Sequence, residues 1–279
     1  MNIKLIQIKD IRNQDILHGI FYCKHKELKK TKYGDSYISL SLIDSSGHIN
    51  AKLWKHSEYY DDKFNEGDIV AVKGSSNMYR EKLEINVSHI SVYQSSIYDK
   101  YGFELKSIIS KANCDSKFIW NKISSFFSKT GLNAKLIKKL YSDFKKQVCS
   151  VPYSIDCDNQ VEGTYLINLL KGLKIFEVLS ENLHKEDLFD HELVYSLIFL
   201  SNFHVITGCK KDLRYKMTEE AASRGVMNVF HDYLKRYKKI SDKKQFSILE
   251  KCLFDYKSKD SFPEREITDR VLALIEYAY

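Results

Sequence analysis

The sequence predicts a chain of two unlike domains, a small β-barrel followed by a larger all-α domain. Near residue 95 the apolar residues change from a spacing of two to a spacing of three or four, which is the change from strand to helix periodicity. The length of 279 residues also suits two domains better than one. We therefore expect one domain over residues 1–95 and a second over residues 96–279.

Five segments in the first domain have the alternation of half-buried strands. Ile38, Leu40 and Leu42, for example, are separated by more polar positions. The expected strands are residues 16–28, 36–43, 48–54, 69–79 and 82–92. Turn-forming residues separate them, and a short helix is expected near residues 57–64, after the third strand. Five strands with a helix at that place predict a barrel of the OB type.

The second domain has helical stripes of apolar residues. One stripe consists of Leu132, Leu136, Ile137, Leu140 and Phe144. Similar stripes recur to the end of the chain, and about seven helices fit between residues 101 and 278. Residues 152–160 are the clearest loop among them. This pattern predicts an all-α domain.

The composition is that of an ordinary globular protein, with 43% hydrophobic and 29% charged residues. The sequence contains neither a long apolar run nor a signal-peptide pattern, so we expect a cytoplasmic location. Six cysteines lack zinc-site spacing and are expected to be reduced thiols. The net charge of +7 divides into +2 for residues 1–95 and +5 for the remainder, which permits a polyanionic partner without requiring one.

The polar face of the expected barrel carries aromatic residues beside lysines. Tyr37 lies on one strand, and Lys52 and Trp54 lie on its hairpin partner. Bases stack on aromatic rings, at about 1–3 kcal/mol for each base, while ammonium groups bind phosphates. This pattern favours binding of single-stranded nucleic acid. Simpler interpretations also exist, because Trp54 can cap the barrel end and Tyr37 can be a packing residue.

Two loop regions are expected to border this face, since OB folds hold strands with such loops. Tyr79, Arg80 and Lys82 lie at the last hairpin, and a run of lysines follows the first strand. The run consists of Lys24, Lys26, Lys29, Lys30 and Lys32. Such a run can equally be a solvated loop.

The segment from Lys30 to Trp54 resembles the OB domain of the YhaM-type 3′→5′ exoribonucleases. Phe64 and the runs Gly67–Val70 and Val72–Gly74 continue the resemblance in order. OB modules of synthetases and replication proteins share the same pattern of strand, Asp, turn Gly and strand. In the YhaM family an HD-type helical phosphohydrolase domain follows, so the resemblance implies an HD-like second domain. It also implies His and Asp ligands that hold divalent metals such as Mn²⁺ or Mg²⁺.

The positions where the resemblance implies metal ligands carry other residues. Asn168 stands at the first ligand position, and Ser201 and Asn202 replace the expected His-Asp pair. Further on, Arg224-Gly225 and Asp255-Tyr256 stand where histidines are expected. Asn and Ser cannot replace both an imidazole and a bridging carboxylate.

Some histidines remain outside those positions. His231-Asp232 is a literal His-Asp pair, but it lies in the wrong helix for the motif. A site rebuilt from His191 and His204 is a remaining alternative. The sequence otherwise shows none of the common catalytic motifs.

We therefore expect a single-stranded DNA- or RNA-binding protein whose HD-like domain is catalytically inactive and needs no cofactor. The helical domain is then expected to form homo-oligomers, bind a protein partner or extend the nucleic-acid surface. One alternative is an active metal-dependent 3′→5′ exonuclease with diverged ligands. A second alternative is a protein-interaction module.

Overall fold

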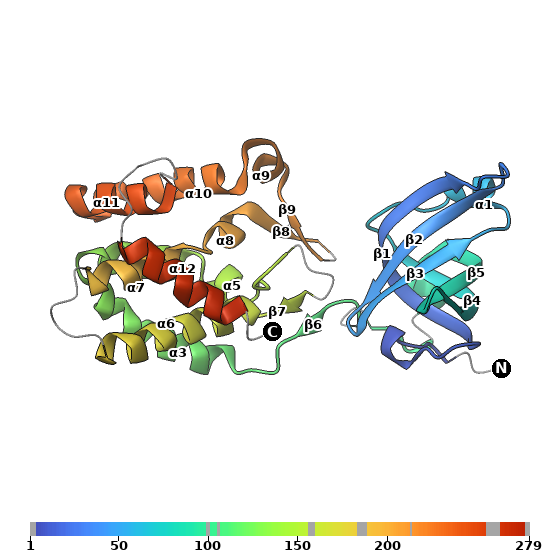
Figure 1. Ribbon diagram of the computed structural model, residues 1–279, viewed down its shortest axis with the longest axis horizontal. Helices are drawn as coiled ribbons and strands as arrows, with labels where there is room; N and C mark the ends of the chain where they lie inside the picture. Colours follow the sequence, from blue (N-terminus) through green and yellow to red (C-terminus); the bar gives the residue numbers. More distant parts are fainter. Residues whose placement is uncertain are drawn as a thin grey trace. The chain divides into compact units, whose positions relative to one another are not determined.

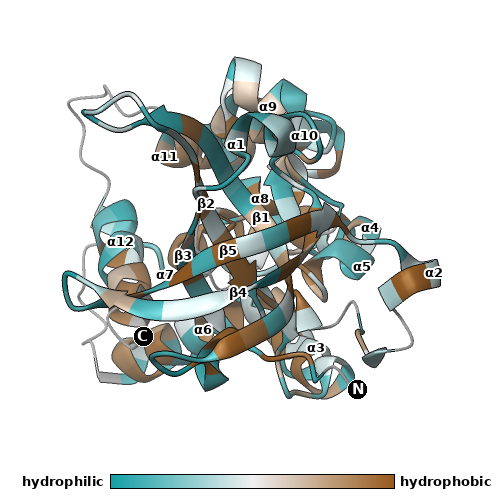
Figure 2. Cartoon of the chain, turned by 90° about the vertical axis from the view of Figure 1, so that its right-hand side faces the viewer, coloured by the Kyte–Doolittle hydropathy of each residue, from teal (hydrophilic) through white to brown (hydrophobic). Residues whose placement is uncertain are grey.

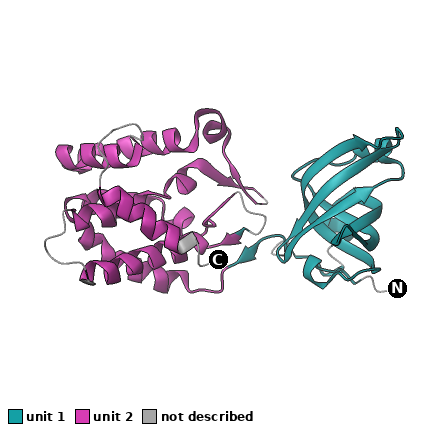
Figure 3. Ribbon diagram, viewed as in Figure 1, with its two compact units in different colours: residues 1–111, 156–160 teal, residues 112–155, 161–279 magenta. Residues whose placement is uncertain are grey.

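The computed structural model describes residues 4–98, 101–104, 107–155, 160–182, 189–212, 214–254 and 263–276. The chain divides into two compact units, residues 1–111 with 156–160 and residues 112–155 with 161–279 (Figure 3). The first unit contains a β-barrel and the second is built mainly from helices. The predicted fold class, a β domain followed by an α domain, is confirmed.

The barrel is closed and has five strands in the order β1-β2-β3-β5-β4 (Figure 1). The strands are β1 (Ile16–Lys30), β2 (Ser36–Asp44), β3 (Gly47–Leu53), β4 (Ile69–Tyr79) and β5 (Lys82–Val92). Neighbouring strands are antiparallel except for the parallel pair β3–β5, which closes the barrel. A 3₁₀ turn, η1 (Ile8–Asp10), precedes the strands, and helix α1 (Ser57–Asp61) connects β3 to β4. The OB-type prediction is thereby confirmed.

The alternation of residue types along the strands separates the inside of the barrel from the outside. Ile38, Leu40 and Leu42 of β2 are buried, whereas the alternate residues Tyr37, Ser39 and Ser41 are partly exposed. Figure 2 shows this alternation as brown and teal bands along the barrel strands. The buried side chains of all five strands form one apolar core.

A buried aspartate fixes the turn between β2 and β3. The Asp44 carboxylate is 4% exposed and accepts hydrogen bonds from the backbone N–H groups of Ile8 (2.8 Å), Ser46 (2.7 Å) and Gly47 (3.2 Å). The Ser46 hydroxyl donates a fourth bond at 2.6 Å. Asp44 therefore ties both the hairpin turn and η1 to the barrel, which satisfies its buried charge.

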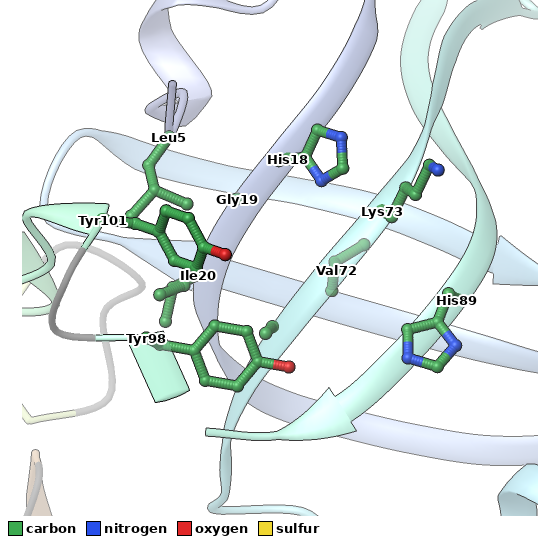
Figure 4. Close-up of a pocket in the computed structure, with 10 residues that line it drawn as sticks. Leu5, His18, Gly19, Ile20, Val72, Lys73, His89, Tyr98 and Tyr101 are labelled. Atoms are coloured by element: carbon green, nitrogen blue, oxygen red, sulfur yellow. The ribbon is translucent and has the colours of Figure 1, made fainter. Parts of the chain in front are cut away.

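Residues 96–111 group with the barrel, although the change of period puts the boundary at residue 95. Helix α2 (Ser95–Tyr98) runs into the start of this stretch, and β6 (Ser110–Lys111) ends it. The Tyr98 hydroxyl lies 2.7 Å from Ser91 Oγ, and the Ser110 hydroxyl donates to the Ser45 carbonyl at 2.7 Å. In Figure 4, Tyr98 and Tyr101 border a hollow of about 160 Å³ over β1 and β4. Local hydrogen bonds thus extend this unit past β5, the last strand of the barrel.

The second unit packs its helices around one central helix, α7 (His191–Leu200). Every residue from Leu193 to Leu200 is buried, as expected for a helix that neighbours surround. Helices α6 (Thr164–Asn182) and α12 (Pro263–Glu276) both contact α7, and α12 also packs on α6 (Figure 1). The other elements are α3 (Ser116–Ser125), η4 (Phe126–Asn133), α4 (Ala134–Asp143), α5 (Lys145–Val148), β7 (Val161–Glu162), α8 (His204–Gly208), β8 (Cys209–Lys211), β9 (Tyr215–Met217), α9 (Glu219–Arg224), α10 (Val226–Lys235), η5 (Lys238–Ile240) and α11 (Lys243–Phe254).

The helical unit is more finely divided than the sequence predicts. Its described residues form ten α-helices, α3 to α12, rather than about seven, because turns interrupt the apolar stripes. Gly225, with φ of 86°, separates α9 from α10, and Leu132 lies outside the helix assigned to its stripe and is 64% exposed. A short antiparallel hairpin, β8–β9, also interrupts the helices. Among the described helices, none is long and apolar enough to cross a membrane.

Candidate nucleic-acid interface

The outer face of β2 and β3 brings together the predicted aromatic and basic residues. In the antiparallel register Ser39 faces Lys52 and Ile38 faces Leu53. Directly opposed residues point to the same side of a sheet, and successive residues point to opposite sides. Tyr37, Lys52 and Trp54 therefore share the outer face, while Ile38 and Leu53 point into the core.

Tyr37 and Trp54 form a single stacked pair at one end of this face. Their ring centroids are 4.4 Å apart and their planes differ by 25°. Trp54 is 45% exposed, while Tyr37 is half-buried. The two residues are thus one aromatic platform with an open indole side, rather than two separate stacking sites. The pairing of Tyr37 with Trp54 also agrees with its interpretation as a packing residue.

Lys52 is ion-paired and does not offer a free charge. Its ammonium lies 2.7 Å from Glu84 Oε2 on β5 and 4.3 Å from the centre of the Tyr79 ring. The side chains of Lys52 and Glu84 are only 21% and 13% exposed, so the pair is screened from solvent on most sides. Lys52 therefore links the platform strand β3 to the β4–β5 hairpin. The structure thus shows Lys52 as a bridge between strands, and its expected role as a phosphate ligand stays a prediction.

The β4–β5 turn presents the remaining cations of this face. Arg80 and Glu81 form the turn with positive φ angles of 47° and 63°, which is the geometry of a two-residue hairpin normally occupied by Asn and Gly. The Arg80 guanidinium lies 5.4 Å from the Tyr79 ring centre. Lys82 faces Tyr79 directly across the hairpin and is exposed. These contacts form a continuous chain from Lys52 through Tyr79 to the turn.

The lysines around the β1–β2 loop divide between different roles. Strand β1 continues to Lys30 instead of ending near residue 28, so these residues alternate between its two sides. Lys30 faces Ser36 and so shares the side of Ile38, away from Tyr37. Lys29 faces Tyr37, and its hydrogen bond with Glu27 raises its pKa. Lys32 is exposed in the loop, 5.0 Å from the Tyr33 ring centre.

Two residues near the loop differ from the sequence interpretation. Lys26 does not border the interface, because its ammonium binds Asp61 Oδ1 at 2.9 Å and the Phe64 carbonyl at 3.0 Å, with its side chain only 10% exposed. It fastens the connection after β3 to the barrel. Tyr33, which the sequence interpretation treated only as a turn residue, is 81% exposed in the β1–β2 loop. The position of Tyr33 beside the turn glycine Gly34 was the sequence feature that could have predicted this exposure.

The residues at the expected metal positions of the helical unit make other contacts. Asn168 on α6 is buried, at 1% exposure. The Ser201 hydroxyl donates to the Leu197 carbonyl at 2.7 Å, and Asn202 Nδ2 donates to the Tyr153 hydroxyl at 2.9 Å. Ser201, Asn202 and His204 border a cavity of about 220 Å³. In the described residues, no three His, Cys, Asp or Glu side chains are grouped as a possible metal site.

The three histidines in the described part of the helical unit are engaged in packing and hydrogen bonds, and His184 lies outside the described residues. His231 Nε2 lies 2.8 Å from Glu250 Oε1, while the neighbouring Asp232 pairs with Arg224 at 2.5 Å. His191 stacks on Phe189 with ring centroids 4.7 Å apart. His204 Nδ1 lies 3.1 Å from the Ser201 carbonyl oxygen, and burial lowers the pKa of this imidazole. The position at Asp255-Tyr256 lies outside the described residues.

Comparison with known proteins agrees with the barrel topology. Residues 25–93 match the family described as OB-fold nucleic acid binding domain, tRNA_anti-codon. The N-terminal domain is an OB fold. No curated protein sequence gives a significant match to this chain.

Several solved structures resemble about a third of the chain. The second OB-fold domain of replication protein A from Methanococcus maripaludis is 24% identical, with 32% of this chain and 94% of that domain covered and a TM-score of 0.27. The mitochondrial single-stranded DNA binding protein Rim1 of S. cerevisiae is 11% identical over 30% of this chain and 97% of its own, with a TM-score of 0.27. At such scores the fold assignment rests on strand order and on the family match.

Proposed function

We propose that this protein binds single-stranded nucleic acid on the outer face of its OB barrel. The observation that carries the proposal is the Tyr37–Trp54 stack, which leaves an indole 45% exposed on a polar sheet face. A second aromatic ring, Tyr79, lies on the same face next to the cations of the β4–β5 turn. Aromatic rings beside cations bind strands because each base can stack while phosphates meet the charges.

The order of groups on this face suggests how a strand would bind. A base would stack on the open side of Trp54, and the next nucleotides would pass Lys52 toward Tyr79. Arg80 and Lys82 from one loop, and Lys32 from the other, would contact phosphates. Since every base has a flat face, such contacts favour single strands of either RNA or DNA with little sequence preference.

We further propose that the helical unit is a non-catalytic relative of the HD phosphohydrolase domain. The resemblance of the N-terminal domain to the YhaM-type exoribonucleases supports this proposal, because an HD domain follows the OB domain in that family. Asn168, Ser201 and Asn202 at the implied ligand positions also support it, since none of them supplies an imidazole or a carboxylate. The helical unit would then contribute to binding or assembly.

One experiment tests both proposals. The full chain is mixed with 5′-labelled oligo(U) and oligo(dT), with Mn²⁺ or with EDTA, and both complex formation and oligonucleotide length are measured. We expect complexes that weaken as salt is added and labelled strands of unchanged length. Shortening that EDTA abolishes would contradict the non-catalytic assignment and favour the exonuclease. Absence of binding at low salt would contradict the nucleic-acid proposal and favour the protein-interaction module.

A further inference from the structure

The basic residues of the chain are concentrated in one stretch of the helical unit. Residues 116–148 contain eight lysines and a single acidic residue, Asp143, a net charge of +7 that equals the net charge of the whole chain. This stretch comprises α3, η4, α4 and α5 (green in Figure 1). The lysines are Lys117, Lys122, Lys129, Lys135, Lys138, Lys139, Lys145 and Lys146. Such local concentration of one charge attracts polyanions, although the whole-chain charge is modest.

Part of this stretch surrounds an open cavity of about 450 Å³ between α3, η4 and α4. Trp120 and Phe127 supply its aromatic wall, while Lys135 and Lys138 supply its basic border. Three serine hydroxyls complete the polar part of the lining, and none of the lining residues carries a carboxylate. We call this hollow the Trp120 cavity. It has the size and the flat apolar wall that a nucleobase needs.

The lysines nearest the Trp120 cavity keep their charge available. Lys129 and Lys139, elsewhere in the stretch, pair with Glu177 and Asp143. Within the described part of the chain, Lys135, Lys138 and Lys145 form no ion pair. Lys145 instead places its ammonium 4.5 Å from the Trp120 ring centre. An exposed cation–π contact contributes only about 0.5–1 kcal/mol, so this lysine can turn to a phosphate at little cost.

We infer that the Trp120 cavity is a second binding surface for single-stranded nucleic acid, separate from the barrel face. A base would enter against the indole while Lys135, Lys138 and Lys145 contact the flanking phosphates. A nucleic acid can meet both parts of this site, because its phosphates bind the unpaired lysines and its bases stack on the aromatic wall. The carboxylates of an acidic peptide meet only the lysines. This inference rests on the proposed function, and it assigns a direct role in strand binding to the helical unit.

The two tryptophans of the chain allow each surface to be observed alone, because Trp54 lies on the barrel face and Trp120 in the helical unit. In Trp54→Phe only Trp120 emits, and in Trp120→Phe only Trp54 emits. Oligo(dT) and oligo(U) are titrated into each variant at low salt while indole emission is recorded. We expect saturable quenching in both variants, with reversal by salt. Quenching of Trp54 without quenching of Trp120 would overturn this inference and leave the barrel proposal intact. Quenching of Trp120 without quenching of Trp54 would support the Trp120 cavity as a binding surface and contradict the barrel proposal.

A pair of lysine variants tests whether the charges act as inferred. In the Trp54→Phe background, Lys138→Gln/Lys145→Gln is compared with Lys243→Gln/Lys244→Gln, which removes two exposed lysines at the start of α11. Lys138→Gln/Lys145→Gln should lower the slope of log Kd against log salt concentration by about 1.4, which is about 0.7 for each phosphate that is no longer neutralised. Lys243→Gln/Lys244→Gln should leave this slope unchanged. Equal effects of the two pairs would contradict a defined site. Equal quenching of Trp120 by heparin would contradict recognition of bases.

Discussion

Tyr37 and Trp54 stack across the β2–β3 hairpin with ring centroids 4.4 Å apart, so each ring holds the other in place. This contact prearranges the platform before any strand binds, which lowers the entropy lost on binding. Stacked aromatic pairs contribute about 0.5–1.5 kcal/mol beyond their buried area. We therefore expect Tyr37→Ala and Trp54→Ala to couple by about 1 kcal/mol in a double-mutant cycle of unfolding free energies. Additive effects in urea unfolding would show that the two rings act independently.

Replacement of Glu84 by Gln should strengthen strand binding. The Glu84 carboxylate neutralises Lys52 at 2.7 Å, so its removal frees one cation on the face. We expect about three- to tenfold tighter binding of oligo(dT) at low salt, and a salt slope steeper by about 0.7. Glu219→Gln, at an exposed position on α9 of the helical unit, makes the same change in net charge and is the control. Weaker binding by Glu84→Gln would mean that Lys52 acts only as a structural bridge.

The turn variant Arg80→Asn/Glu81→Gly should be more stable than the native chain and should bind oligonucleotides more weakly. Both native residues have positive φ angles, of 47° and 63°, which cost roughly 1 kcal/mol each and which Asn and Gly adopt more readily. We expect a higher melting temperature by circular dichroism and weaker oligonucleotide binding, with no change in net charge. A stabilised variant with unchanged affinity would exclude Arg80 from the interface. A variant without added stability would contradict the turn geometry.

Asp44→Ala should destabilise the barrel strongly. This variant leaves four donors around a buried position without their acceptor, at a cost of about 2–4 kcal/mol. Asp35→Ala, at an exposed position in the β1–β2 loop, is the matched control and should change stability by less than about 0.5 kcal/mol. Thermal unfolding followed by circular dichroism measures both. Equal stability of the two variants would refute the structural role of Asp44.

The alternating residues of β2 and β3 were sufficient to predict which side chains share the barrel face. Because successive residues of a strand point to opposite sides of the sheet, the sequence was enough to place Tyr37, Lys52 and Trp54 on the same side. Strand ends were less predictable. Because β1 extends to Lys30, the alternation directs that lysine away from Tyr37.

Contacts between residues distant in sequence escaped the sequence interpretation. The ion pair of Lys52 with Glu84 depends on the parallel pairing of β3 with β5, which no local pattern reveals. Likewise, the Trp120 cavity forms only when α3 and α4 pack against η4. The net charge of +7 in residues 116–148 was visible in the sequence. It was overlooked because the charge was summed over the whole second domain, where acidic residues elsewhere reduce the total to +5.

The most direct test of the barrel proposal is the affinity of the full chain carrying Tyr37→Ala/Trp54→Ala for labelled oligo(dT) and oligo(U). Tyr59→Ala, which removes an exposed ring from α1, is the matched control. Fluorescence anisotropy at low salt gives each Kd, and circular dichroism verifies folding. Loss of one stacked base, at about 1–3 kcal/mol, predicts at least a fivefold weaker Kd for the double variant and an unchanged Kd for the control. A folded double variant that binds as tightly as the control would contradict the barrel face as the nucleic-acid site.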